Sequence, residues 1–224
     1  MNSNYERIKQ NLFNINKDIA ETCKLVNRKT NEIQILPVTK GINDLNQINC
    51  IINLGYNQIC ESYYQELEKK AKFLNHAIFH FIGHVQSNKV KKLCQINNLK
   101  YVHSLARKKI AELFASSMKN ELNFFVQIDY TNKEHRNGLK EEEVLEFLDF
   151  CESLQLRVIG LMTYPLPEEE EFAYSKLHHL KNKIENEKKI KLKISAGTSS
   201  DFKIAIKYGT NYLRIGRAIF DDYC

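Results

Sequence analysis

Apolar runs of strand length recur along the whole chain and alternate with amphipathic stretches of helix length. Within those stretches the apolar residues fall at helical spacing, for example Leu45, Ile48 and Ile52. The runs lie at residues 33–39, 58–62, 77–83, 101–105, 123–130, 157–164, 191–197 and 212–216. Strands that alternate with helices indicate parallel βαβ units, and eight such units close a (β/α)8 barrel. The pattern therefore predicts the α/β class, with residues 1–224 forming a single TIM-barrel domain.

The N-terminal segment predicts one further helix. Between about residues 4 and 26, four apolar residues share one helical face: Ile8, Leu12, Ile15 and Ile19. After the eighth run only residues 217–224 remain, which are too few for a full final helix. We therefore expect the N-terminal helix to fill the vacant place in the outer ring of the barrel.

Composition excludes several classes of protein. The chain has 224 residues, of which 43% are hydrophobic, enough for one full core. No apolar stretch approaches the length of a membrane span, and the N-terminus lacks an apolar signal core. The six cysteines are scattered without a CxxC pair, so they indicate neither a zinc site nor a disulfide framework. Such thiols are typical of a reducing compartment, and we expect a cytoplasmic protein without a membrane partner.

The formal net charge of +6 raises nucleic acid as a possible partner. However, the basic residues form no compact stripe interleaved with aromatic residues. We interpret the charge as solvated helix faces and expect no nucleic-acid partner.

Lys40 is the first candidate for chemistry. It follows an apolar run directly, and a lysine at the end of a buried strand has no obvious packing role. Partial burial favours the neutral amine, which can attack an aldehyde to form a Schiff base. The alternative is a lysine whose ammonium group reaches water along an apolar stem. Taken alone, Lys40 fits the alternative better, so its role depends on the rest of the chain.

The ends of the last two predicted strands suit an anion. Residues 195–201 are small and rich in hydroxyl groups, and they precede a helix-like stretch that offers backbone N–H groups. An ordinary helix N-cap by Thr198 or Ser199 is the alternative. In the eighth strand, Arg214 and Gly216 point to the same side, which is the interior if the residue between them packs outward. Gly216 permits close approach of a ligand; the alternative for Arg214 is a buried structural ion pair.

Several blocks in this order resemble the pyridoxal phosphate homeostasis protein family (the YggS/PROSC type), whose fold is similar to the barrel domain of alanine racemase. The most specific block is HFIGHVQSNK at residues 80–89, close to the family's HFIG-x-x-QxNK. Residues 60–63, CESY, are similar to GENY, and residues 195–201, SAGTSSD, to SMGMSxD. Residues 214–220, RIGRAIF, are similar to RIGxxIFG, and Lys40 matches the strand-ending lysine.

The resemblance implies a cofactor and a role for each matching residue. Lys40 would hold pyridoxal 5′-phosphate as an internal aldimine, while Ser199, Gly216 and the backbone at Arg217 would bind its phosphate. Arg214 would face the pyridine nitrogen and keep it unprotonated, since an arginine only donates hydrogen bonds. A ring in that state is a poor electron sink, which suits a carrier or a racemase better than an aminotransferase.

Three further residues are expected beside the cofactor: Ser62, His80 and Met162. Taken alone, His80 fits a hydrogen-bonded core position better, and Met162 fits apolar packing, which can be against the cofactor ring. The chain also departs from the family pattern. Arg217 replaces a threonine, Ser62 an asparagine and Cys60 a glycine, and Asp221 stands in place of the final glycine. Lys40 is followed by residues 41–42, Gly-Ile, instead of threonine-lysine. These departures bear on affinity more than on the identity of the cofactor.

Three functions follow from this interpretation. The first is a non-catalytic carrier that buffers pyridoxal phosphate or delivers it to apo-enzymes, with no catalytic residue, no metal site and a monomeric state. The second is an enzyme such as an amino-acid racemase, which needs an acid/base group on each face of the substrate carbon. Alanine racemases take the second group from an additional β-domain of the partner subunit, and since the chain ends with the barrel we favour the carrier. The third is a barrel for another phosphorylated ligand, with Lys40 as its charge partner.

Overall fold

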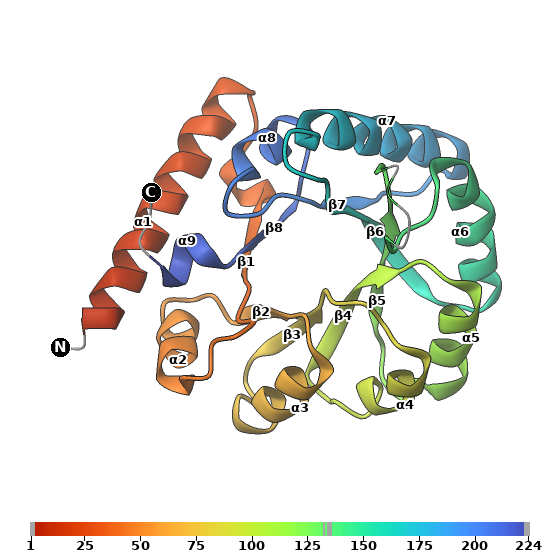
Figure 1. Cartoon of the computed structure of the whole chain (residues 1–224). Helices are drawn as coiled ribbons and strands as arrows, with labels where there is room; N and C mark the ends of the chain where they lie inside the picture. Colours follow the sequence, from red (N-terminus) through yellow and green to blue (C-terminus); the bar gives the residue numbers. More distant parts are fainter. Residues whose placement is uncertain (1–2, 132, 134–135, 222–224) are drawn as a thin grey trace.

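All eight predicted strands are present and parallel in the computed structural model, which describes residues 3–131, 133 and 136–221. They are β1 (Gln34–Pro37), β2 (Gln58–Glu61), β3 (Ile78–Phe81), β4 (Leu99–Leu105), β5 (Asn123–Ile128), β6 (Arg157–Thr163), β7 (Lys193–Ser195) and β8 (Tyr212–Ile215). Neighbouring strands pair in the order β1-β8-β7-β6-β5-β4-β3-β2. The strands form a nearly closed ring (Figure 1), so the predicted (β/α)8 barrel is confirmed.

The ring closes between β1 and β2 only at the carboxyl ends of these strands. An isolated parallel bridge joins Val38 to Cys60, and the Thr39 N–H donates to the Cys60 carbonyl oxygen at 3.0 Å. Because the bridge lies directly before Lys40, the closing point of the barrel also ties the Lys40 segment to β2.

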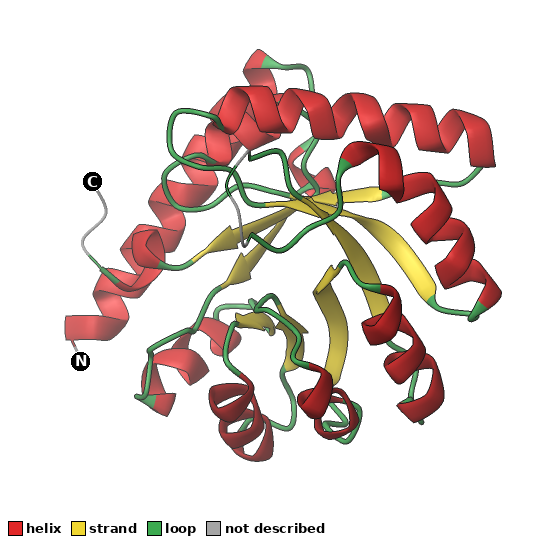
Figure 2. Cartoon of the chain, turned by 45° about the vertical axis from the view of Figure 1, so that its right-hand side comes forward, coloured by secondary structure: helices red, strands yellow, loops and turns green. Residues whose placement is uncertain are grey.

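Helices surround the sheet on its outer side (Figure 2). In chain order they are α1 (Ser3–Leu25), α2 (Leu45–Asn53), α3 (Tyr64–Phe73), α4 (Val90–Leu93), α5 (Lys108–Ser117), α6 (Val144–Ser153), α7 (Glu170–Lys188), α8 (Phe202–Lys207) and α9 (Arg217–Phe220). None of them, within the part of the chain that the structure describes, is both long and apolar enough to cross a bilayer. The five described cysteines are buried, free thiols, and Cys224 lies outside the described residues.

The N-terminal helix α1 occupies the place left by the short α9, as predicted. Its apolar face is buried, and it packs against α8, α9 and α2. The buried side-chain amide of Asn11 donates to the carbonyl oxygens of Ile219 at 3.0 Å and Asp221 at 2.7 Å. The two ends of the chain are therefore joined by packing and by hydrogen bonds.

The core has two parts, as expected for a barrel whose strands are covered by helices. The larger part lies between the strands and the helices and includes Ile215 of β8. The smaller part fills the barrel interior with five buried side chains: Leu36, Cys60, Phe125, Met162 and Tyr212. The interior is thus a packed core, and space for a ligand opens only above it, at the strand ends.

Candidate functional site

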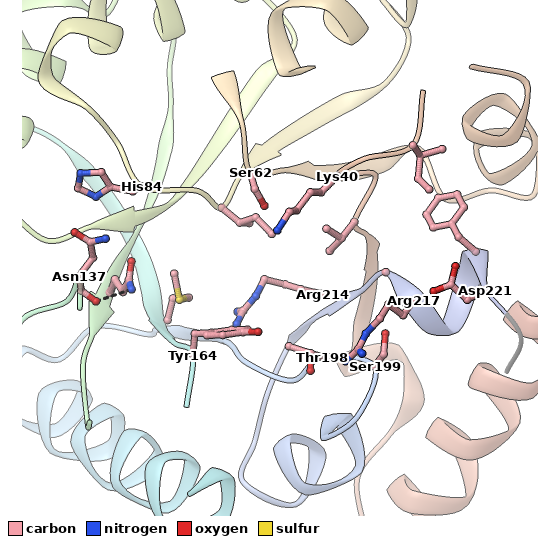
Figure 3. Close-up of a pocket in the computed structure, with 17 residues that line it drawn as sticks. Lys40, Ser62, His84, Asn137, Tyr164, Thr198, Ser199, Arg214, Arg217 and Asp221 are labelled. Carbon is pink, nitrogen blue, oxygen red and sulfur yellow. Dashed lines mark hydrogen bonds between the residues drawn. The ribbon is translucent and has the colours of Figure 1, made fainter. Parts of the chain in front are cut away.

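A pocket of about 630 Å³ opens at the carboxyl ends of the strands (Figure 3). Seven of the eight residues predicted from the sequence line it: Lys40, Ser62, Met162, Ser199, Arg214, Gly216 and Arg217. The side chains of Lys40 and Arg214 extend into it, from the end of β1 and from β8. The remaining predicted residue, His80, is not part of the pocket wall. The tertiary fold therefore brings most of the predicted residues to one place.

Lys40 lies in a tight turn directly after β1. The Ile42 N–H donates to the Thr39 carbonyl oxygen at 3.0 Å, and Gly41 has a φ of +78°. A positive φ at the third residue of such a turn is typical of a type II turn and favours glycine. The Lys40 side chain is exposed, with its Nζ 5.3 Å from the centroid of the Tyr63 ring. The expected partial burial of Lys40 is therefore wrong: the turn presents the amine to the open pocket.

Arg214 lies at the floor of the pocket and is only 5% exposed. Its Nη1 donates to Ser195 Oγ at 2.7 Å, and its Nη2 donates to the Thr163 carbonyl oxygen at 2.9 Å. Ile215 packs outward, so the predicted alternation is observed. The alternative of a buried ion pair is not observed, because no carboxylate of the described residues pairs with this guanidinium. The guanidinium N–H groups that are not used in these two hydrogen bonds can donate to a ligand in the pocket.

A chain of hydrogen bonds runs from Arg214 down through the barrel interior. Ser195 Oγ lies 2.9 Å from His103 Nδ1, and His103 Nε2 lies 2.9 Å from His80 Nδ1. His80 Nε2 lies 3.0 Å from the Gln58 side-chain oxygen, and the His80 ring stacks on Tyr101 with centroids 4.0 Å apart. The structure thus places His80 in the barrel core behind Arg214, and the predicted cofactor contact is corrected accordingly.

The Gln58 side-chain oxygen determines the direction of these hydrogen bonds. Because that oxygen only accepts, His80 donates to it from Nε2 and accepts at Nδ1 from His103 Nε2. A neutral His103 then accepts at Nδ1 from the Ser195 hydroxyl, whose oxygen accepts from Arg214. Burial lowers the pKa of His80 to about 3. Burial also lowers the pKa of His103, with further lowering by His80 and Arg214. Both imidazoles are therefore neutral, and each donor in the chain meets one acceptor.

Ser199 and Arg217 form the side of the pocket next to the carboxyl ends of β7 and β8. Ser199 Oγ accepts a hydrogen bond from the Ala218 N–H at 3.1 Å, which leaves the hydroxyl proton free for a ligand. The exposed Arg217 adds a positive charge, while the carboxylate of Asp221 lines the same pocket. With Lys40 and Arg214, the described residues of the wall include three positive side chains against one negative, which favours an anionic ligand.

Hydrogen bonds to the Asp201 carboxylate hold the turn that contains Ser199. Asp201 Oδ1 accepts from Thr198 Oγ1 at 2.8 Å, and Oδ2 accepts from the buried Tyr174 hydroxyl at 2.6 Å. The Gly197 N–H donates to the same tyrosine oxygen at 3.2 Å. Helix α8 begins at Phe202 with Asp201 as its N-cap residue, so neither Thr198 nor Ser199 caps this helix. Ser199 is thus left available at the pocket.

Sequence reasoning missed the far side of the pocket, which is lined by His84, Gln127, Asn137 and Tyr164. Burial lowers the pKa of His84, and the positive charge of Arg107 lowers it further. Each of these residues lies at the end of a strand or in the loop that follows it. Their position near the end of a strand was the one sequence signal that they line a pocket. That signal is weak, because the sequence does not distinguish a pocket-lining polar residue in a loop from an ordinary solvent-facing one.

Comparison with known proteins agrees with this geometry. The family described as "Alanine racemase, N-terminal domain" matches residues 15–223. The pyridoxal phosphate homeostasis protein of Haemophilus influenzae is 33% identical over 229 residues, covering 95% of this chain and 94% of that protein. The protein of the same name from Schizosaccharomyces pombe is 32% identical over 178 residues, 75% of each. PipY of Synechococcus elongatus, solved with PLP bound, has a TM-score of 0.77 at 21% identity and covers 90% of this chain and 99% of PipY. The similarity to PipY shows that the two chains share a fold.

Proposed function

This chain belongs to the alanine racemase N-terminal domain family and, within it, to the pyridoxal phosphate homeostasis proteins, and from that premise we propose that it binds pyridoxal 5′-phosphate. We propose further that it buffers the cofactor or delivers it to apo-enzymes, and that it does so without catalysis of its own. The relatives are named for homeostasis and not for a reaction, which supports this proposal.

The observation that carries the proposal is a buried arginine that pairs with no carboxylate of the described residues and shares a pocket with a lysine. Arg214 has N–H groups to spare, and its hydrogen bonds to Ser195 and Thr163 hold the guanidinium at the floor of the pocket. It suits a hydrogen-bond acceptor such as an unprotonated ring nitrogen. Lys40 extends into the same pocket and suits an aldehyde. A pyridine ring with an unprotonated nitrogen and an aldehyde group offers an acceptor to Arg214 and a carbonyl carbon to Lys40.

The other residues bind the remainder of the ligand. The free hydroxyl proton of Ser199 and the guanidinium of Arg217 are donors for a phosphate, and the absence of a side chain at Gly216 leaves room beside them. Met162 and Ser62 line the wall, Met162 with apolar surface. When bound, pyridoxal phosphate supplies an aldehyde that a primary amine can attack. The role of this chain is then to hold the ring, offer the Lys40 amine and release the cofactor again.

A spectral titration with pyridoxal phosphate tests the proposed function. The wild-type chain is expected to develop the absorbance band of an imine, and borohydride reduction is expected to fix the cofactor on Lys40, as read by peptide mass spectrometry. Lys40→Ala is expected to lose the band and to bind about 10–100-fold more weakly, equivalent to about 1.4–2.8 kcal/mol, because the phosphate contacts remain. Lys69→Ala, which removes an exposed lysine of α3 outside the pocket, is the matched control.

Two results would contradict the proposal. A wild-type chain that ignores pyridoxal phosphate would leave a barrel for another phosphorylated ligand, with Lys40 as a charge partner. Rapid turnover of a D- or L-amino acid that Lys40→Ala abolishes would identify an enzyme such as a racemase.

A further inference from the structure

A cluster of charged side chains lies against the turn that contains Lys40; two of its members are buried and the third, Glu66, is partly exposed. It consists of Glu61 at the end of β2 and of Glu66 and Lys70 on α3, and is called the Lys70 cluster below. Lys70 Nζ lies 2.5 Å from Glu61 Oε1 and 3.1 Å from Glu66 Oε2. Lys70 is 3% exposed and Glu61 is fully buried. None of the three residues lines the pocket, so the cluster does not contact a ligand there.

The Lys70 cluster holds the backbone on both sides of Lys40. On one side, Lys70 Nζ donates to the Thr39 carbonyl oxygen at 2.6 Å, and Thr39 Oγ1 donates to Glu61 Oε1 at 2.5 Å. On the other side, the Gly41 N–H donates to Glu66 Oε2 at 2.9 Å. Lys40 itself makes no hydrogen bond to the cluster among the described contacts. The cluster therefore fixes the Cα position of Lys40 and leaves its side chain free.

Stability alone does not account for these three charges. Apolar side chains of similar size in place of a buried ion pair are often neutral or stabilising. Burial raises the pKa of Glu61 even though Lys70 and Thr39 favour its ionised form. Its second oxygen, Oε2, is buried without a hydrogen-bond partner among the described residues. What the charges provide, and apolar packing cannot, is directed hydrogen bonding to Thr39 and Gly41.

The turn itself needs such support. Gly41 has no side chain to pack, and glycine is the residue with the greatest backbone freedom. Without the bond from its N–H to Glu66, the segment after Thr39 would depend on a single hydrogen bond, from the Ile42 N–H to the Thr39 carbonyl oxygen. The orientation of the Lys40 Cα–Cβ bond would then vary, and the amine would reach the aldehyde position in only a fraction of the conformers.

We propose that Glu61, Glu66 and Lys70 are positioning residues for Lys40. They act through the backbone of Thr39 and Gly41, and they hold the amine of Lys40 where it meets a carbonyl group in the pocket. This inference rests on the proposed function, since it assigns the cluster a part in capturing the aldehyde. It predicts that loss of the cluster slows bond formation and leaves non-covalent binding intact.

Glu66 offers the sharpest test because it contacts Gly41 and leaves the Glu61–Lys70 pair in place. Stopped-flow absorbance at saturating pyridoxal phosphate measures the rate of covalent bond formation. Glu66→Ala is expected to slow it about tenfold or more, since small displacements of a reacting group have effects of this size. Glu66→Gln is expected to restore most of the rate, because its amide oxygen can still accept from the Gly41 N–H. Glu68→Ala removes the same charge from α3 without touching the turn, and is expected to react like wild type.

Two readouts separate positioning from loss of the pocket. Pyridoxine 5′-phosphate lacks the aldehyde, and its affinity is expected to be the same in wild type and Glu66→Ala. In the ligand-free protein, amide hydrogen exchange at residues 40–42 is expected to be faster in Glu66→Ala and unchanged in Glu68→Ala. If Glu66→Ala does not fold, Glu66→Asp keeps the charge with a side chain too short for Gly41 and is expected to react slowly.

The outcomes are distinct. A wild-type rate in Glu66→Ala, or in Glu66→Asp if that variant is needed, overturns the positioning role and leaves the proposed function intact. The positioning role is likewise overturned if Glu66→Gln reacts as slowly as Glu66→Ala. A wild-type chain that takes up no pyridoxal phosphate overturns both the positioning role and the proposed function.

Discussion

A chain that begins at residue 29 is expected not to fold. The deletion removes α1, whose inner face buries four aliphatic side chains: Ile8, Leu12, Ile15 and Ile19. Burial of each such side chain contributes about 1.5–3 kcal/mol, and thus about 6–12 kcal/mol in total. This is comparable to the whole net stability of a typical domain, about 5–15 kcal/mol. The deletion also exposes the apolar surfaces of α2, α8 and α9 against which α1 packs.

Circular dichroism and urea denaturation of the shortened chain measure this effect. The expected result is an insoluble chain, or a soluble one without a cooperative unfolding transition. The full-length Phe13→Ala variant is the control, because Phe13 lies on the same helix but is 63% exposed, and its loss is expected to change stability little. A shortened chain that remains soluble and unfolds cooperatively would show that α1 is an accessory to a complete barrel.

Mild acid is expected to destabilise the folded chain steeply through His80 and His103. Burial lowers the pKa of His80 to about 3 and lowers that of His103 in the same direction. As the pH falls below about 6.5, the ordinary value for histidine, the unfolded chain binds two protons that the folded chain does not. Stability is therefore lost as the pH falls, by about 2.7 kcal/mol per pH unit for two histidines, or about 4 kcal/mol at pH 5. The raised pKa of Glu61 acts in the opposite direction, because the folded chain binds a proton there more readily than the unfolded chain does.

Urea denaturation at a series of pH values between about 7.5 and 5 gives this slope. His80→Gln removes one of the two buried imidazoles and is expected to halve the dependence on pH, whatever it does to stability at neutral pH. His76→Asn removes an exposed histidine just after α3 and is expected to retain the steep dependence. Equal slopes in wild type and His80→Gln would show that the buried imidazoles take up protons in the folded state.

Much of the fold could be predicted because it depends on local periodicity. Each of the eight strands was predicted within a few residues, and so was α1. The errors fall at the strand ends. The first run extends to residue 39, but β1 ends at Pro37, because Val38 pairs with β2 only through an isolated bridge before the chain enters the turn around Lys40. Conversely, β4 begins at Leu99, two residues before the predicted start, since pairing with β3 extends a strand that the apolar pattern alone does not reach.

The residues of the candidate site also divide into those that the sequence placed correctly and those that it did not. Position in or after the carboxyl end of a strand was sufficient to place Lys40, Arg214 and Ser199 at one pocket, because the carboxyl ends of all barrel strands meet at one face. It was not sufficient for His80, which points into the barrel but lies deeper than the pocket. Alternation along a strand gives the side of the sheet and not the height of a side chain along the barrel axis.

The sequence by itself determined the barrel, the inward direction of Arg214 and the identity of the groups at the strand ends. These properties follow from the spacing of neighbours along the chain. Only the tertiary structure decided which distant groups meet: Arg214 with Ser195 and His103, and the Lys40 turn with Glu66 and Lys70. Such contacts depend on how strands and helices pack in space, and hydrogen bonds between residues far apart in the chain leave no periodic trace in the order of residues.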